Sequence, residues 1–242
     1  MGAITLRAAL PRDGRRRYAH PVDALTLSRM ADGSPEIFAS VQGEGVSAGV
    51  PSTFVRLAVC NLRCAWCDTA YAFHEGRRRT ADDVLAELAR WPCRLVCLTG
   101  GEPLSQPAAF PFVARLLEAG YEVTIETSGH VPTDGLDPRA VVILDVKTPG
   151  SGEHARMHWP NLERLRPQDE CKLVIADRAD YEWARGFVRE RRPHERCTVL
   201  FSPVHGQLDP GQLGRWLLED GLPVRLQVQL HKYLWPGVER GV

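Results

Sequence analysis

The stretch Cys60-Asn-Leu-Arg-Cys64-Ala-Trp-Cys67 places three thiols within eight residues and offers no fourth thiol nearby. A structural zinc site is closed and tetrahedral, and it usually takes four N or S ligands in two separated pairs. An iron–sulfur cubane held by only three cysteines instead keeps one iron open to a small molecule. We therefore interpret this loop as the anchor of a 4Fe–4S cluster that takes part in chemistry. A zinc site, or three ordinary buried cysteines, is the alternative.

Short apolar stretches on either side of this loop alternate with helical patterns. The expected strands are 53–59, 94–98, 121–126, 140–145, 171–175, 197–201 and 224–228, and the expected helices are 80–90, 111–119, 178–191 and 210–219. Strands that alternate with helices pair in parallel through right-handed crossovers. About six such units predict an α/β fold that is a partial (β/α)6 TIM-type barrel. Residues 1–34 are polar and rich in Arg, Pro and Gly, so we expect an N-terminal arm there and a single domain over 35–242.

Polar loops follow five of these strands. They are the cysteine loop and the segments 100–103, 126–129, 145–147 and 202–205. Because chemistry in parallel barrels takes place at the carboxyl ends of the strands, we expect these loops to meet at one rim.

Composition excludes several classes of protein. The 242 residues contain 30 Lys and Arg against 30 Asp and Glu, so no net positive charge attracts nucleic acid, and a small-molecule substrate is expected. No apolar run suggests a signal peptide or a membrane span. Seven cysteines, an odd number, argue against a disulfide framework and for the reducing cytoplasm. Hydrolase, kinase and dinucleotide-binding motifs are absent.

Four smaller motifs carry polar groups that suit a ligand. Gly-Gly-Glu-Pro at 100–103 and Gln-Gly-Glu-Gly at 42–45 leave the backbone open to a ligand, although either can be an ordinary turn. Asp68 and Thr69 offer hard oxygen donors of the kind that Mg²⁺ prefers, or they simply end the loop. The segment 231–236 combines a histidine with aromatic groups, and a packed structural histidine is the alternative there.

The cysteine motif together with Gly-Gly-Glu-Pro resembles the radical S-adenosylmethionine superfamily. Five further motifs narrow the resemblance to the 7-carboxy-7-deazaguanine synthases, over roughly residues 36 to 242: Ser-Val-Gln-Gly-Glu-Gly at 40–45, Phe-Val-Arg at 54–56, Cys-Asp-Thr at 67–69, Glu-Thr-Ser-Gly at 126–129 and Gln-Leu-His-Lys-Tyr-Leu-Trp at 229–235. Two departures are visible. Asp-Val-Lys stands at 145–147, where that family often has Ser-Pro-Lys, and residues 237–242 extend past the point where shorter members end.

The resemblance implies a set of site residues. Cys60, Cys64 and Cys67 would hold the 4Fe–4S cluster, and Thr69 would bind Mg²⁺. Residues implied to contact S-adenosylmethionine are Trp66, Gly101, Asp145, Val146, Lys147, Ser202, Pro203, Val204 and His205. Residues implied to bind substrate are Val41, Gln42, Gly43, Glu44, Arg56, Thr99, His231 and Pro236, and three of these, Glu44, Arg56 and His231, would be catalytic.

The resemblance also implies the reaction. One electron from an external reductant of the flavodoxin or ferredoxin type would cleave S-adenosylmethionine to a 5′-deoxyadenosyl radical. That radical would take hydrogen from carbon 6 of 6-carboxy-5,6,7,8-tetrahydropterin, and ring contraction with loss of ammonia would give 7-carboxy-7-deazaguanine, a precursor of queuosine. Such a lyase is expected to be a cytoplasmic homodimer. The alternatives are an activase of glycyl-radical enzymes and a non-enzymatic iron–sulfur electron carrier.

Overall fold

The fold is built on one curved sheet of ten strands in a computed structural model that describes residues 24–74 and 76–242. Seven strands run parallel: β3 (Pro51–Leu57), β5 (Leu95–Gly100), β6 (Glu122–Thr127), β7 (Val141–Val146), β8 (Glu170–Ile175), β9 (Thr198–Pro203) and β10 (Arg225–Leu226). Three strands extend the sheet in antiparallel pairing: β1 (Ala24–Leu27), β2 (Ile37–Val41) and β4 (Arg77–Thr80). Because β10 and β4 form opposite ends of the strand order, the sheet stays open. The predicted partial barrel is confirmed.

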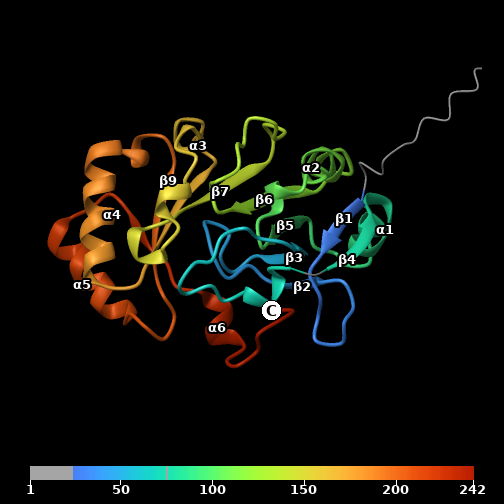
Figure 1. The fold of residues 1–242 in the computed structure, drawn as a ribbon, viewed down its shortest axis with the longest axis horizontal. Helices are drawn as coiled ribbons and strands as arrows, with labels where there is room; N and C mark the ends of the chain where they lie inside the picture. Colours follow the sequence, from blue (N-terminus) through green and yellow to red (C-terminus); the bar gives the residue numbers. More distant parts are fainter. Residues whose placement is uncertain (1–23, 75) are drawn as a thin grey trace, which may run out of the picture.

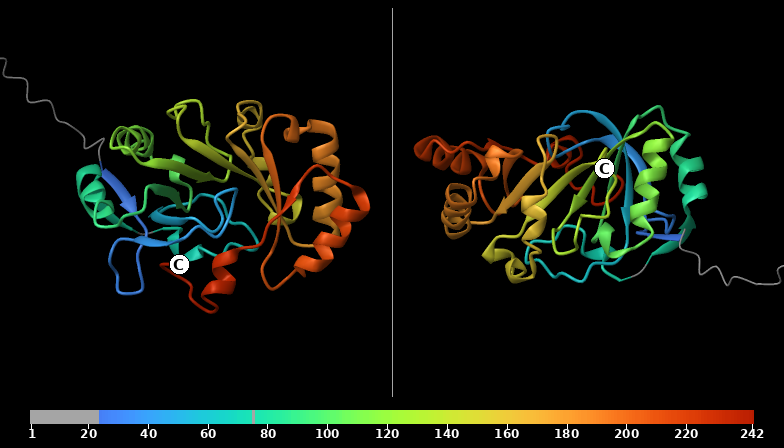
Figure 2. Two further views of the ribbon diagram at one scale, coloured as in Figure 1. Left: turned by 180° about the vertical axis from the view of Figure 1, so that it is seen from behind. Right: turned by 90° about the horizontal axis from the view of Figure 1, so that it is seen from above.

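Helices cover the outside of this sheet. Figure 1 shows α1 (Ala81–Leu88), α2 (Ala109–Glu118), α4 (Arg178–Arg191) and α5 (Pro210–Asp220) around its edge, and the views in Figure 2 show the same layering from behind and from above. Two short helices are α3 (Pro160–Glu163) and α6 (Leu230–Leu234). Helix α4 has the predicted bounds, because the side chain of Asp177 caps its first turn by accepting a hydrogen bond from the Asp180 N–H (2.9 Å).

Residues 128–140 lead from β6 to β7 without a helix, and the sequence predicts none in this crossover. The side chain of Asn161 holds this segment in place, since its amide nitrogen donates to the carbonyl oxygens of Gly129 (3.1 Å) and Val131 (2.8 Å). Side-chain hydrogen bonds therefore help to hold this crossover, which has no helix of its own.

Alternation along the parallel strands separates the core from the inner face of the sheet. On β7, Val142, Leu144 and Val146 are buried in the core beneath the helices, whereas Asp145 faces the opposite side. On β8, Cys171, Leu173 and Ile175 are likewise in the core, and Lys172 faces inward. Because successive side chains of a strand point to opposite faces, each strand contributes to both the core and the inner surface.

The expected arm boundary at residue 34 is wrong for residues 24–34. Strand β1 lies between β3 and β4, and its side chains Leu25 and Leu27 are fully buried. The first 34 residues are polar on average, so their composition does not indicate this four-residue strand. Residues 1–23, the rest of the predicted arm, lie outside the described residues. Among the described residues, no helix has the length and apolar character needed to cross a membrane.

Burial of β1 predicts a stability cost for Leu25→Ala. Removing a fully buried leucine side chain destabilises a core by about 2–5 kcal/mol. Urea unfolding of the variant checks this value, with Leu218→Ala as the control because that leucine is 85% exposed. Equal free energies of unfolding for the two variants would show that β1 is not part of the core.

Candidate active site

A cavity of about 310 Å³ lies at the carboxyl ends of the parallel strands. That volume suits a small-molecule ligand. Of the residues implied by the resemblance, those that line the cavity are Val41, Gln42, Gly43, Glu44, Arg56, Cys60, Cys64, Trp66, Cys67, Thr69, Thr99, Gly101, Asp145, Lys147, Ser202, Pro203, Val204, His205 and His231. The five polar loops thus meet at one rim, as the strand-end rule predicts.

Two implied residues do not line the cavity. Val146 is fully buried on the helix side of β7, because it is one residue out of phase with the inward-facing Asp145 and Lys147. Pro236 is exposed, beyond the end of α6. The side chains of these two residues therefore lie outside the cavity lining, and their expected contacts with S-adenosylmethionine and substrate stay predictions.

The cysteine loop is fixed at its start by the neighbouring glycine segment. The Gly101 N–H donates to the Leu57 carbonyl oxygen (2.9 Å), and the Glu102 N–H donates to the Val59 carbonyl oxygen (2.9 Å). A Cβ atom on Gly101 would lie 2.5 Å from the Val59 oxygen, so only glycine allows this approach. Val59 itself has a φ of 75°, an uncommon conformation that the surrounding bonds hold in place.

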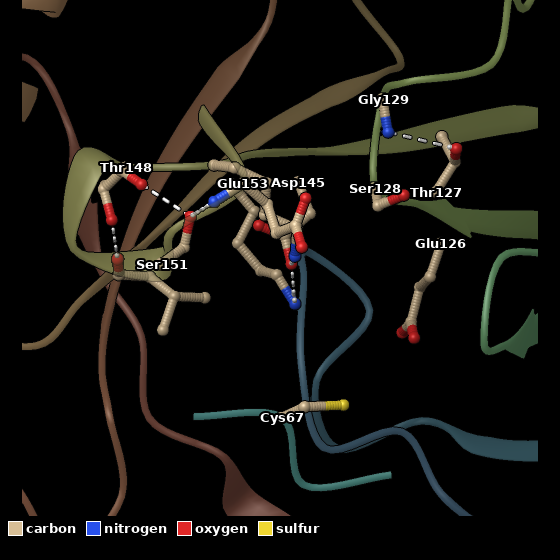
Figure 3. Close-up of polar contacts among 12 residues, drawn as sticks. Cys67, Glu126, Thr127, Ser128, Gly129, Asp145, Thr148, Ser151 and Glu153 are labelled. Atoms are coloured by element: carbon tan, nitrogen blue, oxygen red, sulfur yellow. Dashed lines mark hydrogen bonds and ion pairs between the residues drawn. The ribbon is translucent and has the colours of Figure 1, made fainter. Parts of the chain in front are cut away.

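A second set of bonds holds the middle of the loop from the β7–β8 connection. The Ala65 N–H donates to the Ser151 carbonyl oxygen (3.0 Å), and the Arg63 N–H donates to a carboxylate oxygen of Glu153 (2.6 Å). Ser151 and Glu153 are in turn joined by a hydrogen bond, which Figure 3 shows above Cys67. The loop is therefore restrained from both sides before any ligand binds.

The three thiols of the cysteine loop line the same cavity. Iron–sulfur clusters take cysteine thiolates as ligands, so a cluster is the group that this loop would hold. Burial raises the pKa of the thiols of Cys60 and Cys64, so positive irons would supply the charge that stabilises their thiolates.

Four charged side chains form a chain across the cavity. The Lys172 ammonium lies 2.6 Å from a carboxylate oxygen of Glu44 and 3.7 Å from one of Asp145, whose same oxygen lies 3.0 Å from the ammonium of Lys147. Burial alone would raise the pKa of Glu44, but the charge of Lys172 and a hydrogen bond from Gln229 lower it to about 2. Burial opposes the charge of Lys172 as well, yet Glu44 and Asp145 raise its pKa well above the usual value. Glu44 and Lys172 therefore stay charged at neutral pH.

Protein donors already occupy most of the Glu44 carboxylate. Gln229 donates to one oxygen (2.9 Å), while Gln227 and Lys172 donate to the other (3.3 and 2.6 Å). By contrast, the side-chain nitrogen of Gln42 is buried and has no partner among the described residues. Gln42 thus offers a ligand a free donor, whereas Glu44 is fixed in place.

His231 packs directly against the backbone of Gly43. A Cβ atom at position 43 would lie 2.1 Å from Nδ1 of the histidine, so the contact requires glycine. Burial lowers the pKa of His231 despite the nearby charge of Glu44. The imidazole is therefore neutral at physiological pH and can donate from one nitrogen and accept at the other.

The sequence motifs predict no role for two further cavity residues, Lys172 and Glu126. Lys172 lies in an apolar strand, where a charged residue among apolar ones at alternating positions is a signal for an inward-facing group. Glu126 belongs to a segment that is expected at the rim. Its carboxylate accepts a hydrogen bond from the Thr99 hydroxyl (2.8 Å), and Figure 3 shows it extending from β6 into the same space as Cys67 and Asp145.

Comparison with known proteins agrees with this geometry. Residues 55–145 match the radical SAM superfamily, and the open parallel sheet with a three-cysteine loop at its rim defines an enzyme of that class. A 7-carboxy-7-deazaguanine synthase of Koribacter versatilis is 46% identical over 222 residues, covering 86% of this chain and 98% of the relative. One from Chlorobaculum tepidum is 42% identical over 210 residues, covering 86% and 96%. This chain belongs to the 7-carboxy-7-deazaguanine synthase family.

A solved structure supports the fold. The crystal structure of QueE from Escherichia coli matches with a TM-score of 0.68 at 23% identity, covering 86% of this chain and 95% of that one. Family membership confirms the expected cofactors, a 4Fe–4S cluster, S-adenosylmethionine and Mg²⁺. The comparisons support this interpretation and not the activase or electron-carrier alternatives.

The Glu44–Lys172 pair predicts a pH dependence of stability. Because the pKa of Glu44 is lowered from 4.5 to about 2, its ionised form stabilises the fold above pH 4.5, and this contribution is lost as the pH falls through that interval. In Lys172→Met the carboxylate loses its cation, so the variant is destabilised by about 3–5 kcal/mol near neutral pH and by less in acid.

Urea unfolding from about pH 6 to about pH 3 measures this difference. Lys232→Met serves as the control, since the Lys232 ammonium lies 3.8 Å from a carboxylate oxygen of the partly exposed Asp68. A constant difference between Lys172→Met and the unaltered protein across this range would contradict the predicted coupling.

Proposed function

We propose that this chain converts 6-carboxy-5,6,7,8-tetrahydropterin to 7-carboxy-7-deazaguanine with loss of ammonia. One observation carries the proposal: a single cavity joins three thiols suited to a cluster with a cationic and amide-lined pocket suited to a polar ring that bears a carboxylate. The curated relatives named 7-carboxy-7-deazaguanine synthase, matched over nearly their full length, support it.

The cofactor side of the cavity would be formed by the cysteine loop and the facing strand ends. Cys60, Cys64 and Cys67 would hold the cluster, with Lys147 and the segment 202–205 beside S-adenosylmethionine. When bound, the cluster and S-adenosylmethionine supply the radical that removes a hydrogen atom from the substrate. Lys147, kept charged because Asp145 raises its pKa against the effect of burial, would offer its ammonium to the carboxylate of S-adenosylmethionine.

The substrate side would bind the pterin by complementary polar groups. The two terminal nitrogens of Arg56 make no hydrogen bond within the described residues, so the guanidinium can donate both to the substrate carboxylate. The free amide of Gln42 would donate to a ring acceptor, and neutral His231 would pair with a second ring position. These contacts would hold the reactive carbon in place and keep water out.

The expected partners and location belong to the same proposal. Turnover would need one electron from an external reductant of the flavodoxin or ferredoxin type, as the family resemblance implies. A homodimer follows from the family resemblance, and a cytoplasmic location follows from cysteines that must stay reduced.

Anaerobic incubation with 6-carboxy-5,6,7,8-tetrahydropterin, S-adenosylmethionine, Mg²⁺ and dithionite tests the function. We expect mass analysis to find 7-carboxy-7-deazaguanine and a trace of 5′-deoxyadenosine. Cys64→Ala should form neither, whereas Cys93→Ala should be active because Cys93 lies outside the cavity. A reconstituted protein that makes 5′-deoxyadenosine without the deazaguanine would refute the proposed substrate.

Mg²⁺ binding at Thr69 gives a separate prediction. Thr69 lines the cavity with its hydroxyl 3.8 Å from the sulfur of Cys67, and this oxygen would be a donor of the kind that Mg²⁺ prefers. Thr69→Ala should raise the Mg²⁺ concentration for half-maximal activity about tenfold, and Thr69→Ser should restore it. Activity that survives complete removal of Mg²⁺ by a chelator would count against this ligand.

A further inference from the structure

A buried carboxylate stands directly behind Arg56. The side chain of Glu36 is fully buried at the start of β2, and one of its oxygens accepts hydrogen bonds from Nε of Arg56 (3.0 Å) and from the hydroxyl of Tyr71 (3.0 Å). Its other oxygen has no partner among the described residues. A buried anion is costly unless cations and donors satisfy it, so Glu36 and Arg56 depend on each other.

Glu36 contacts Nε of the Arg56 guanidinium and leaves its two terminal nitrogens available. Because Nε is bound to Glu36, the two terminal nitrogens remain for the cavity, which Arg56 lines with 14% of its side chain exposed. Planar guanidinium groups bind carboxylates best through two parallel donors. A restraint at Nε therefore fixes the direction in which the two terminal nitrogens point.

The C-terminal tail completes the arrangement. Figure 1 shows the chain end returning to the region of residues 70–72, where the Arg240 guanidinium stacks over the Tyr71 ring at 4.0 Å from its centroid. Arg240 also donates to the carbonyl oxygen of Arg29 (3.0 Å), and Val242 lines the cavity. Within the segment 237–242, Arg240 thus covers one face of the Tyr71 ring.

We propose that Glu36 and Tyr71 are positioning residues that aim Arg56 at the substrate carboxylate, and that Arg240 holds Tyr71 in place. This inference rests on the proposed function, in which Arg56 binds that carboxylate. An arginine fixed before the ligand arrives loses little side-chain freedom on binding, so the restraint improves affinity for the carboxylate in particular. A purely structural ion pair would instead affect every ligand of the cavity alike.

The ratio of two dissociation constants distinguishes a positioning role of Glu36 from a purely structural ion pair. Calorimetry with the holoenzyme, containing cluster, S-adenosylmethionine and Mg²⁺, would give the Kd of 6-carboxypterin and that of pterin, which lacks the carboxylate. The preference for 6-carboxypterin is the Kd of pterin divided by the Kd of 6-carboxypterin. In Glu36→Gln we expect this ratio to fall about tenfold with the Kd of pterin unchanged, as for loss of a charge-assisted contact. Tyr71→Phe, which removes only one hydroxyl, and Arg240→Ala should lower the preference by smaller factors.

Two control variants mark complete loss and full retention of the preference for 6-carboxypterin. Arg56→Ala should lose the preference entirely, and Arg215→Ala on the exposed face of α5 should keep it. If Glu36→Gln fails to fold, Tyr71→Phe carries the test alone. The inference is overturned if these variants weaken both ligands equally or neither. Failure of the unaltered protein to convert the tetrahydropterin would instead overturn the proposed function, because the affinity ratio is measured without turnover.

Discussion

The loop that carries Cys60, Cys64 and Cys67 is held by backbone hydrogen bonds on two sides, and the geometry of the cavity depends on this restraint. The glycine segment after β5 fixes its beginning, and the β7–β8 connection fixes its middle. Because these hydrogen bonds hold the loop, the three thiols keep their positions in the cavity without a bound group. A cluster would therefore bind to thiols that are already in place.

Ion pairs connect the charged side chains of the cavity. Lys172 lies between Glu44, on the side implied to bind substrate, and Asp145, on the side implied to bind S-adenosylmethionine. The Asp145 carboxylate is balanced by Lys147 and Lys172 together. Arg56 stands further along with its own buried counter-ion, Glu36. Each of these charges is therefore partnered by protein before a ligand enters, which lowers the cost of reorganisation on binding.

The sequence predicted the elements that local patterns determine. Helix α4 has its expected bounds because a capping aspartate and a helical apolar period agree, and the strand-end loops meet because parallel strands share one direction. Strand β1 could not be predicted, since four residues within a polar segment become a strand only by pairing with β3 and β4. The same limit explains the site: the motif at 145–147 suggested three contacts in a row, but strand alternation turns Val146 into the core. The Glu36–Arg56 pair and the Arg240–Tyr71 contact join residues that are separated in the chain, and no local pattern indicates them.

Electron paramagnetic resonance of the anaerobically reconstituted, dithionite-reduced protein tests the central claim most directly. A cluster bound by three thiolates keeps one iron free for an outside ligand, so S-adenosylmethionine should change the spectrum of the reduced 4Fe–4S cluster. The Cys93→Ala variant should show the same change. A protein that retains zinc and takes up no iron, or a cluster whose spectrum does not respond to S-adenosylmethionine, would contradict the account.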